Sequence, residues 1–285
     1  MTSKASSPNI HIPSGGSAEE AIACTTHLGI VAHQDDLEFM AFHGILHCFR
    51  SDTEWFGGIV CTDGAGSART RAYAAVGADE LPRIRMQEQH LAAGIGRYSF
   101  VSQLGYPSKS IARPIDSPLV ADLSALLGQM RTKILYTHNP ADKHETHLRV
   151  LVAVLEAIRA VPADHRPERL LGCEGWRDLD WMNDQDKVVL DVGGAEHLAA
   201  SLNGVFDSQI AGGKRYDLAV AGRRRANATL LDSHSGDEIA EATFAMDLTP
   251  LIGADTADLV DFTLQYVERL REDIRVKLER TLARS

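Results

Sequence analysis

Short apolar runs alternate with longer segments of helical periodicity through roughly the first 165 residues, and this alternation most constrains the fold. The apolar runs read HLGIVAH, WFGGIVCTD, RYSFVSQLGY and TKILYTHNP, the third being the weakest. Apolar residues recur at helical spacing over 36–49, 81–94, 118–130 and 144–160. Strands and helices that alternate in this way are typical of a parallel sheet covered by crossover helices. We therefore expect an α/β sandwich.

The alternation loosens in the second half of the chain. KVVLDVG is strand-like, and helical periodicity returns over 195–209, 216–227 and 258–282. We expect residues 26–165 to form the core and residues 166–285 to form a C-terminal α/β elaboration that completes the sheet and the pocket within one compact domain. Residues 1–25 are polar and contain Pro and Gly, so we expect a flexible N-terminal tail.

Composition excludes several classes of partner. The formal charge of -10 and the pI near 5.6 argue against nucleic acid, which normally binds a basic face. No apolar run has membrane-spanning length and the N-terminus does not resemble a signal peptide, so we expect a cytoplasmic protein without a transmembrane segment. The four cysteines are widely spaced, which predicts neither a disulfide framework nor a thiolate zinc site.

Three of the expected strands end in polar residues that can bind a metal. His33, Asp35 and Asp36 follow the first, Asp63 ends the second, and the segment 138–147 follows the fourth. In open parallel sheets, ligands gather beyond the carboxyl ends of the strands. Two adjacent carboxylates repel each other, and a dication would offset that repulsion. Imidazole and carboxylate form a normal ligand set for Zn²⁺ with an open water position.

The segment HNPADKHETH is the expected source of the third ligand. It follows a strand and enters a helix, and His144 and His147 are spaced to share one face of the first turn. Taken alone, the aspartates could simply cap a helix, and the histidine-rich turn could be only a hydrogen-bonded loop. Their occurrence together at two strand ends favours one metal site.

The two motifs together resemble those of the LmbE/PIG-L family of zinc-dependent de-N-acetylases. AHQDDLE, followed about a hundred residues later by HNPADKHETH, is similar to the family pattern Ala-His-Pro-Asp-Asp-Glu and His-Pro-Asp-His. The likeness spans roughly residues 27 to 160, and TDG at 62–64 and Arg85-x-x-Glu88 fall in the expected order. The resemblance implies a Rossmann-like three-layer core with a mainly parallel sheet.

By this resemblance, His33, Asp36 and His147 are expected to bind Zn²⁺, or another divalent ion such as Fe²⁺. Asp35 is expected to be the general base, and His144 to stabilise the oxyanion or act as an acid. Arg85, Asp63 and Asp142 are the expected substrate-binding residues. Two positions depart from the pattern: Gln34 replaces a proline, and Thr146 replaces an aspartate that tunes the histidine two residues before it. Asp142 or Glu145 could compensate for the second change.

The resemblance implies a hydrolase that removes acetyl from an N-acetylated, GlcNAc-type amino-sugar conjugate by means of a zinc-activated water. Two alternatives remain open: a zinc amidase or esterase that acts on a non-sugar acyl group, and a non-catalytic, metal-bearing binding protein. We expect a small-molecule substrate and no nucleic acid, and the chain could form a homo-oligomer.

Other conspicuous residues favour structural roles. His43 and His47 lie one helical turn apart, and the apolar residues around them favour packing or a pocket wall over a metal site. Arg223–Arg225 indicates a solvated helix face, and His234 a surface loop. Trp176, Trp181 and Met182 are compatible equally with a sugar-binding wall and with simple burial.

Overall fold

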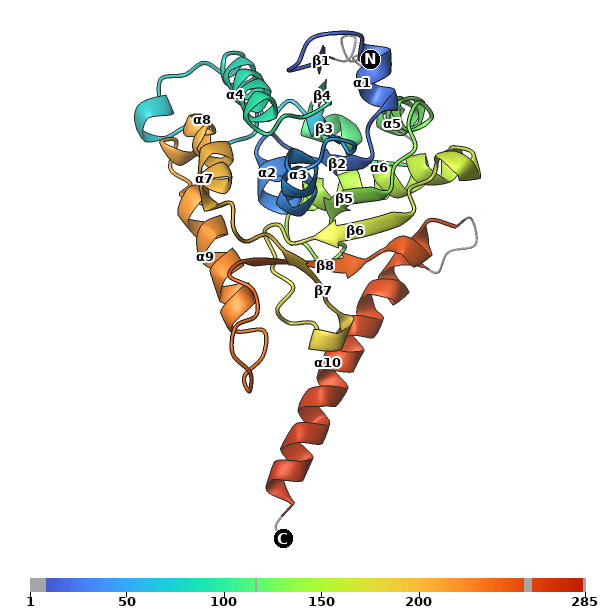
Figure 1. Cartoon of the computed structure of the whole chain (residues 1–285), viewed down its shortest axis with the longest axis vertical. Helices are drawn as coiled ribbons and strands as arrows, with labels where there is room; N and C mark the ends of the chain where they lie inside the picture. The colour runs from blue at the N-terminus through green and yellow to red at the C-terminus, as the bar shows by residue number, and fades with distance from the viewer. Residues whose placement is uncertain (1–8, 116, 254–257, 284–285) are drawn as a thin grey trace.

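The computed structural model describes residues 9–115, 117–253 and 258–283, and at its centre lies a mixed eight-stranded sheet (Figure 1). The strand order is β1-β4-β3-β2-β5-β6-β8-β7. The strands are β1 (Asn9–His11), β2 (His27–Val31), β3 (Phe56–Thr62), β4 (Phe100–Tyr106), β5 (Ile134–His138), β6 (Arg169–Cys173), β7 (Val188–Asp191) and β8 (Ala242–Asp247).

The five inner strands β4, β3, β2, β5 and β6 run parallel, and the outer strands are antiparallel to their neighbours. In register, Ile30 pairs with Ile59 of β3, and Gly29 pairs with Tyr136 of β5. The carboxyl ends of β2, β3 and β5 therefore lie at one edge of the sheet, which is where the motifs begin. The mainly parallel α/β sandwich expected from the sequence is confirmed.

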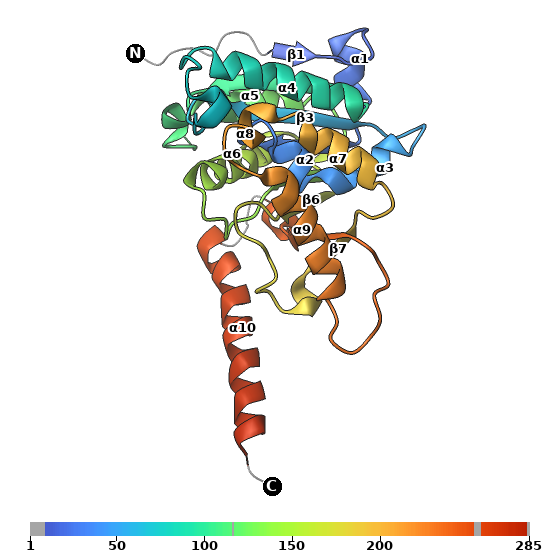
Figure 2. The same cartoon turned by 90° about the vertical axis from the view of Figure 1, so that its left-hand side faces the viewer.

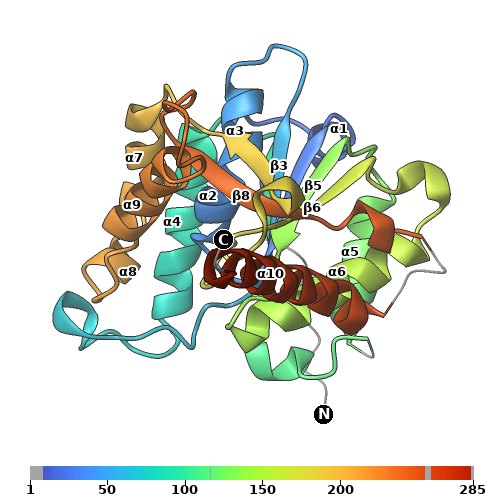
Figure 3. The same cartoon turned by 90° about the horizontal axis from the view of Figure 1, so that it is seen from below.

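Helices cover both faces of the sheet (Figure 3). One face packs against α1 (Ala18–Ala23), α5 (Pro118–Leu127) and α6 (Glu145–Ala160), and the other against α2 (Asp36–Met40), α3 (Phe42–Phe49), α4 (Leu81–Ile95) and α7 (Glu196–Gly204). The remaining α-helices are α8 (Asp207–Ile210), α9 (Tyr216–Thr229) and α10 (Leu259–Leu282). None of the helices in the described ranges is both long and apolar enough to cross a membrane.

Alternate residues of the inner strands enter the two cores, as the period of an extended strand requires. In β2, Leu28 and Ile30 enter the core beneath α5 and α6, whereas Val31 enters the core beneath α2 and α3. Gly29 and Gly58 leave room for Leu37 of α2, because a Cβ at either glycine would lie within 2.5 Å of a Leu37 methyl group. The two glycines therefore bring the first turn of α2 close to the sheet.

Several segments differ from the sequence expectation. The helix expected over 36–49 is divided at Ala41, whose φ of -101° and ψ of 17° end α2. The divided helix lets Gly44 approach the Tyr136 ring, where a Cβ would lie 2.5 Å from Cε2. The helix expected over 195–209 is likewise divided, into α7 and α8. β6 and β8 were not anticipated, and residues 9–23 of the expected tail contain β1 and α1.

Candidate functional site

The loop between β2 and α2 carries the first motif in an unusual backbone conformation. Asp35 has a φ of 92°, a region that costs a non-glycine residue roughly 1–3 kcal/mol. The loop is held in place by its neighbours: the Asp35 N–H donates to Gln89 Oε1 at 3.3 Å, and Arg85 Nη2 donates to the Gln34 carbonyl at 2.6 Å. Gln34, at the position of the family proline, donates through Nε2 to Gln103 Oε1 at 3.1 Å. The strain therefore lies beside the polar cluster of His33, Asp36 and His147.

Asp36 lies at the centre of that cluster. Its Oδ2 accepts from the His33 N–H at 2.8 Å and lies 3.2 Å from His33 Nδ1 and 3.4 Å from His147 Nε2. Burial raises the pKa of Asp36, but the His147 ring and then His33 lower it further, so that the net pKa is well below its usual range. The carboxylate is therefore ionised, with two imidazoles against one oxygen.

The second motif lies across from the first. His144 is the N-cap of α6, and His147 lies in its first turn with 1% of its surface exposed. The His33 and His147 ring centroids are 5.3 Å apart, although the residues are 114 positions apart in the chain. Asp142 accepts from the His144 N–H at 3.0 Å through Oδ1, and its Oδ2 lies 3.2 Å from His147 Nδ1. Asp142 therefore orients the His147 ring and holds the backbone of His144.

The residues fit a divalent cation. One ligand atom from each of His33, Asp36 and His147 lies within 4.8 Å of the others. Among the described residues, the buried His147 Nε2 has no hydrogen-bond partner. Its Nδ1 faces a carboxylate, which is the usual arrangement behind a metal-binding histidine. Two imidazoles and a carboxylate suit Zn²⁺ and do not discriminate strongly against Fe²⁺.

His144 has a defined tautomer. Its Nδ1 accepts from the Thr146 N–H at 3.2 Å, so a neutral ring carries its proton on Nε2. Burial, followed by the nearby His147 and His33, lowers the pKa of His144 to about 4. The backbone of Thr146 thus fixes the ring where the family pattern has an aspartate. At neutral pH, His144 is a neutral N–H donor.

Arg85 is buried beneath the strained loop, with 1% of its surface exposed. Besides the Gln34 carbonyl, Nη2 contacts Asp35 Oδ2 at 3.3 Å, and Nη1 donates to the Gly64 carbonyl at 3.2 Å and to the Ser67 hydroxyl. Burial raises the pKa of Asp35, and Arg85 opposes that rise without cancelling it. Arg85 therefore ties Asp35 to the loop that follows β3.

A second layer of buried polar residues supports the motif. Gln89 and Tyr98 donate to Glu38 Oε1 at 2.8 and 2.7 Å, and burial raises the pKa of Glu38 to about 7. His138, fully buried at the end of β5, accepts from the Ala32 N–H at 2.8 Å and stacks on His147 with ring centroids 3.8 Å apart. Gln89 and Tyr98 were not predicted as site residues, and His138 was predicted only as part of the segment 138–147. In the sequence, the one indication of a role for His138 is its position as a polar residue at the end of an apolar strand.

A cavity of about 580 Å³ opens beside the cluster. Its floor contains His33, Asp35, Asp36, Arg85, His144 and His147. Its wall is formed by residues of the C-terminal half: Trp176, Lys214, Tyr216, Arg223 and Arg224. Trp176 contacts Tyr216 edge-on with ring centroids 6.0 Å apart, and Lys214 Nζ lies 5.0 Å above the Trp176 ring. The site thus joins a polar floor to an aromatic and cationic wall.

The structure corrects one expectation and leaves others as predictions. The interpretation of Arg223–Arg225 as a solvated face was wrong for the first two: Arg223 lines the cavity, and Arg224 is buried and donates to the Glu38 carbonyl at 2.8 Å. Arg224 also lies over the Phe42 ring, a contact between distant segments that the linear sequence does not show. Asp63 and Asp142 are not among the lining residues, and Asp63 instead accepts from the Ala65 N–H at 3.0 Å.

The remaining conspicuous residues lie mostly outside the cavity. Met182 is buried in the core, and Trp181 packs against it. His234 is exposed, and His43 Nδ1 lies 2.9 Å from the Tyr136 hydroxyl. Only Trp176 of this group lines the cavity.

Solved structures of other proteins share the fold at low sequence identity. The conserved protein TT1542 from Thermus thermophilus has a TM-score of 0.62 at 17% identity, covering 79% of this chain and 94% of that one. The hydratase GalB from Pseudomonas putida has a TM-score of 0.62 at 16% identity, covering 79% and 96%. N,N'-diacetylchitobiose deacetylase from Pyrococcus horikoshii has a TM-score of 0.60 at 13% identity, covering 83% and 88%.

Comparison with curated proteins found no match. Residues 28–158, which carry both motifs, match the family described as PIG-L, GlcNAc-PI de-N-acetylase. Through this segment, which is slightly less than half of the chain, the protein is similar to the PIG-L family of de-N-acetylases.

Proposed function

We propose that this protein is a divalent-metal-dependent hydrolase that removes an acetyl group from the nitrogen of an amino-sugar conjugate. One observation supports the proposal above the others. His33, Asp36 and His147 converge on the floor of a cavity that Asp35 and His144 also line. Among the described residues, His147 Nε2 has no hydrogen-bond partner and lies 3.4 Å from Asp36 Oδ2. Amide hydrolysis needs a set of metal ligands, a carboxylate and an N–H donor, all beside a cavity that can hold the substrate.

His33, Asp36 and His147 would hold the metal, and Asp142 would orient His147 behind it. When bound, a divalent cation supplies Lewis-acid polarisation of the acyl carbonyl and lowers the pKa of a coordinated water. Zn²⁺ is the expected ion because its preferred ligands are imidazole nitrogen and carboxylate oxygen.

The surrounding side chains supply the proton transfers. Asp35 accepts a proton from the attacking water and returns it to the departing nitrogen, while Arg85 holds the carboxylate in place. His144, neutral with its proton on Nε2, donates a hydrogen bond to the carbonyl oxygen as negative charge develops there. The carbon–nitrogen bond then breaks, and acetate and a free amine leave.

The wall of the cavity supports a sugar conjugate as substrate. Trp176 and Tyr216 offer ring faces and edges against which a pyranose can pack, and Lys214 and Arg223 offer donors to hydroxyl or anionic groups. Proteins that share the fold include a diacetylchitobiose deacetylase and a teicoplanin deacetylase. A zinc amidase or esterase that acts on a non-sugar acyl group would use the same floor with a different wall.

The fold also occurs in a hydratase, so the fold alone does not identify the reaction as hydrolysis.

The test is acetate release by chelator-stripped protein reloaded with Zn²⁺ or Fe²⁺. The substrates are N-acetylglucosamine, N,N'-diacetylchitobiose, a GlcNAc glycoside with an anionic aglycone, N-acetylated simple amines and an aryl acetate. We expect metal-dependent acetate release from the sugars and at least tenfold less from simple amines. Release from simple acyl groups alone would support the amidase or esterase alternative. Metal loading without release from any substrate would overturn hydrolysis and favour the non-catalytic binding protein.

A further inference from the structure

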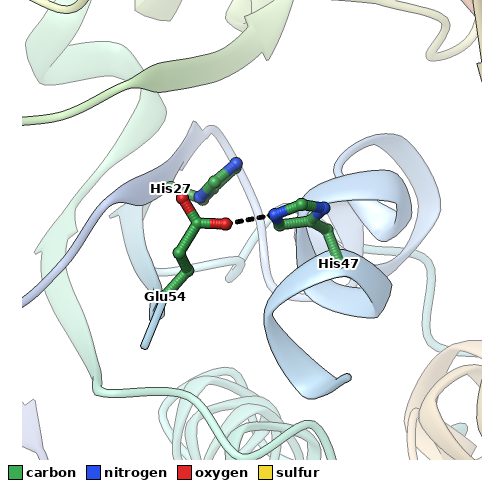
Figure 4. A group of neighbouring side chains, drawn as sticks. All are labelled: His27, His47 and Glu54. Atoms are coloured by element: carbon green, nitrogen blue, oxygen red, sulfur yellow. Dashed lines mark hydrogen bonds and ion pairs between the residues drawn. The ribbon is translucent and has the colours of Figure 1, made fainter. Parts of the chain in front are cut away.

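A second group of potential metal-binding side chains lies at the amino end of β2, whereas His33 follows its carboxyl end. The group consists of His27, His47 and Glu54 (Figure 4). His27 is the first residue of β2, His47 lies in α3, and Glu54 lies just before β3. One ligand atom from each lies within 4.8 Å of the others. The His27 and His47 ring centroids are 4.8 Å apart, and His47 Nε2 contacts Glu54 Oε2. Three segments far from the cavity thus bring two imidazoles and a carboxylate together.

Two of the three donors, His27 and Glu54, are in the protonation states that a cation needs. Burial, with a smaller contribution from the nearby His47, lowers the pKa of His27 to about 4, so the ring is neutral at neutral pH. Hydrogen bonds from Lys133 and His47 lower the pKa of Glu54 to about 2. The Thr26 hydroxyl lies 3.0 Å from His27 Nδ1 and orients the ring, as an oxygen behind a metal-binding histidine does.

We propose that His27, His47 and Glu54 form a second divalent-cation site, of the Zn²⁺ class, that is separate from the site at the cavity floor. The side chain of His47 is 46% exposed and that of Glu54 19%, so solvent can supply the remaining ligands. The ion would replace the His47–Glu54 hydrogen bond and connect β2, α3 and the segment before β3. Lys133 binds the other oxygen of Glu54, Oε1, and its positive charge works against the ion.

The test is the number and affinity of zinc sites in the full chain, measured by competition with a chromophoric chelator. We expect two equivalents in the unchanged protein. His47→Ala and Glu54→Gln should each remove one equivalent and leave any acetate release unchanged, whereas His33→Ala should remove the other. Lys133→Met should tighten the second site about threefold to tenfold. The exposed His234→Ala is the matched control and should retain both equivalents.

A single equivalent that is lost in His33→Ala and unaffected by His47→Ala would overturn the second site. A second equivalent of zinc that persists in both His47→Ala and Glu54→Gln would also overturn the second site. Because the metal count is read without substrate, failure of this site is distinguishable from failure of the proposed hydrolase.

Independently, α10 presents an apolar stripe with no partner in the described part of the chain. The helix projects from the body and ends far from it (Figure 2). Phe262 is buried and Tyr266 packs against the core, so the first turns of α10 hold it to the body. On the other side of the helix, exposed apolar residues recur at spacings of four, three, seven and four: Val260, Leu264, Val267, Ile274 and Leu278. This is the period of a coiled-coil seam, with Arg271 at the one intervening seam position.

We infer that α10 pairs with α10 of a second copy of this chain in an antiparallel coiled coil. A parallel pair would set Arg271 directly against Arg271 of the second copy. An antiparallel pair sets it against Ile274 and brings Glu268 toward Arg275 of the other helix, twice by symmetry. It also places the two bodies at opposite ends of the pair. The intrahelical pairs of Arg271 with Glu268 and Arg275 with Glu272 leave the stripe uncovered.

The test is the molar mass of the full chain by light scattering across a concentration series. We expect a dimer that Ile274→Asp with Leu278→Asp converts to a monomer, with helicity and metal content retained. Val276→Asp is the matched control: Val276 is also exposed but lies off the stripe, so this variant should remain a dimer. A monomeric unchanged protein, or equal effects of Ile274→Asp with Leu278→Asp and of Val276→Asp, would overturn the pairing.

The relative orientation of the two α10 helices is tested by a separate measurement. Spin labels on Leu282→Cys, in a chain with the exposed Cys24 replaced by serine, should lie about 28 Å apart at a rise of about 1.5 Å per residue. A separation under about 15 Å would show a parallel pair and overturn the antiparallel arrangement.

Discussion

The Oδ2 atom of Asp142 lies 3.2 Å from the Nδ1 atom of His147, so a buried carboxylate holds the ring whose other nitrogen faces Asp36. The same carboxylate accepts from the Trp176 N–H at 3.1 Å, which ties the cluster of His33, Asp36 and His147 to the wall of the cavity. Burial raises the pKa of Asp142, but the hydrogen bond and charge of His147 and further N–H donors lower it below its usual value. Its contacts are those of a positioning residue.

Replacing Asp142 with Asn should weaken metal binding without removing any ligand. The amide keeps the shape of the carboxylate but loses the charge that holds His147, and such changes typically cost about 10- to 100-fold in metal affinity. The measurement is zinc competition at neutral pH, with the exposed Glu145→Gln as control. An unchanged zinc affinity in Asp142→Asn would contradict the positioning role. The predicted role of Asp142 as a substrate-binding residue would then remain.

Asp35→Asn should retain metal and lose turnover. An amide cannot accept the proton of the attacking water, and a general base contributes typically about 10²- to 10⁴-fold. Metal content and acetate release are measured on the same preparation. Asp63→Asn is the comparison, because Asp63 faces its own loop, and it should remain within about threefold of the unchanged protein. A large loss in Asp63→Asn would restore Asp63 as a substrate-binding residue.

Arg85→Met should destabilise the fold as well as the site. The change leaves the Gln34 and Gly64 carbonyls and the Asp35 carboxylate without their buried donor, at a cost of about 3 kcal/mol. Urea unfolding measures the loss of stability. Arg83→Met, two residues earlier on the exposed side of α4, should lie within about 0.5 kcal/mol of the unchanged protein.

His90 should make stability depend on mildly acidic pH. Its ring stacks on His11 with centroids 4.2 Å apart, and burial, followed by the nearby His11, lowers the pKa of His90 to about 4. The unfolded chain takes up the proton near pH 6.5, so it binds more protons than the folded chain between about pH 6.5 and 4. Stability should therefore fall as the pH falls through this window. Thermal unfolding of His90→Gln should show a smaller fall there, and an identical pH profile would contradict the prediction.

Four of the five inner strands, β2 to β5, could be predicted from sequence because they are mostly apolar runs. A strand buried on both faces carries apolar side chains at most positions, as LGIV does in β2. β1, β6 and β8 were not predicted in the same way. β1 has only three residues, and β8 pairs antiparallel with β6 and β7, which depends on contacts between distant segments. Strand existence at a sheet edge is decided by such partners, not by local pattern.

The sequence by itself determined the chemistry-bearing residue types and the order in which the strands deliver them: His33, Asp35 and Asp36 after β2, and His144 and His147 at the start of α6. Tertiary structure alone decided which atoms face one another. The strained Asp35 backbone and the burial of Arg224 depend on hydrogen bonds and packing between segments more than fifty residues apart. The proton on His144 Nε2 depends on the local contact from the Thr146 N–H. Spacing along a chain records which residues share a turn, but hydrogen-bond geometry and desolvation arise only when separate turns meet.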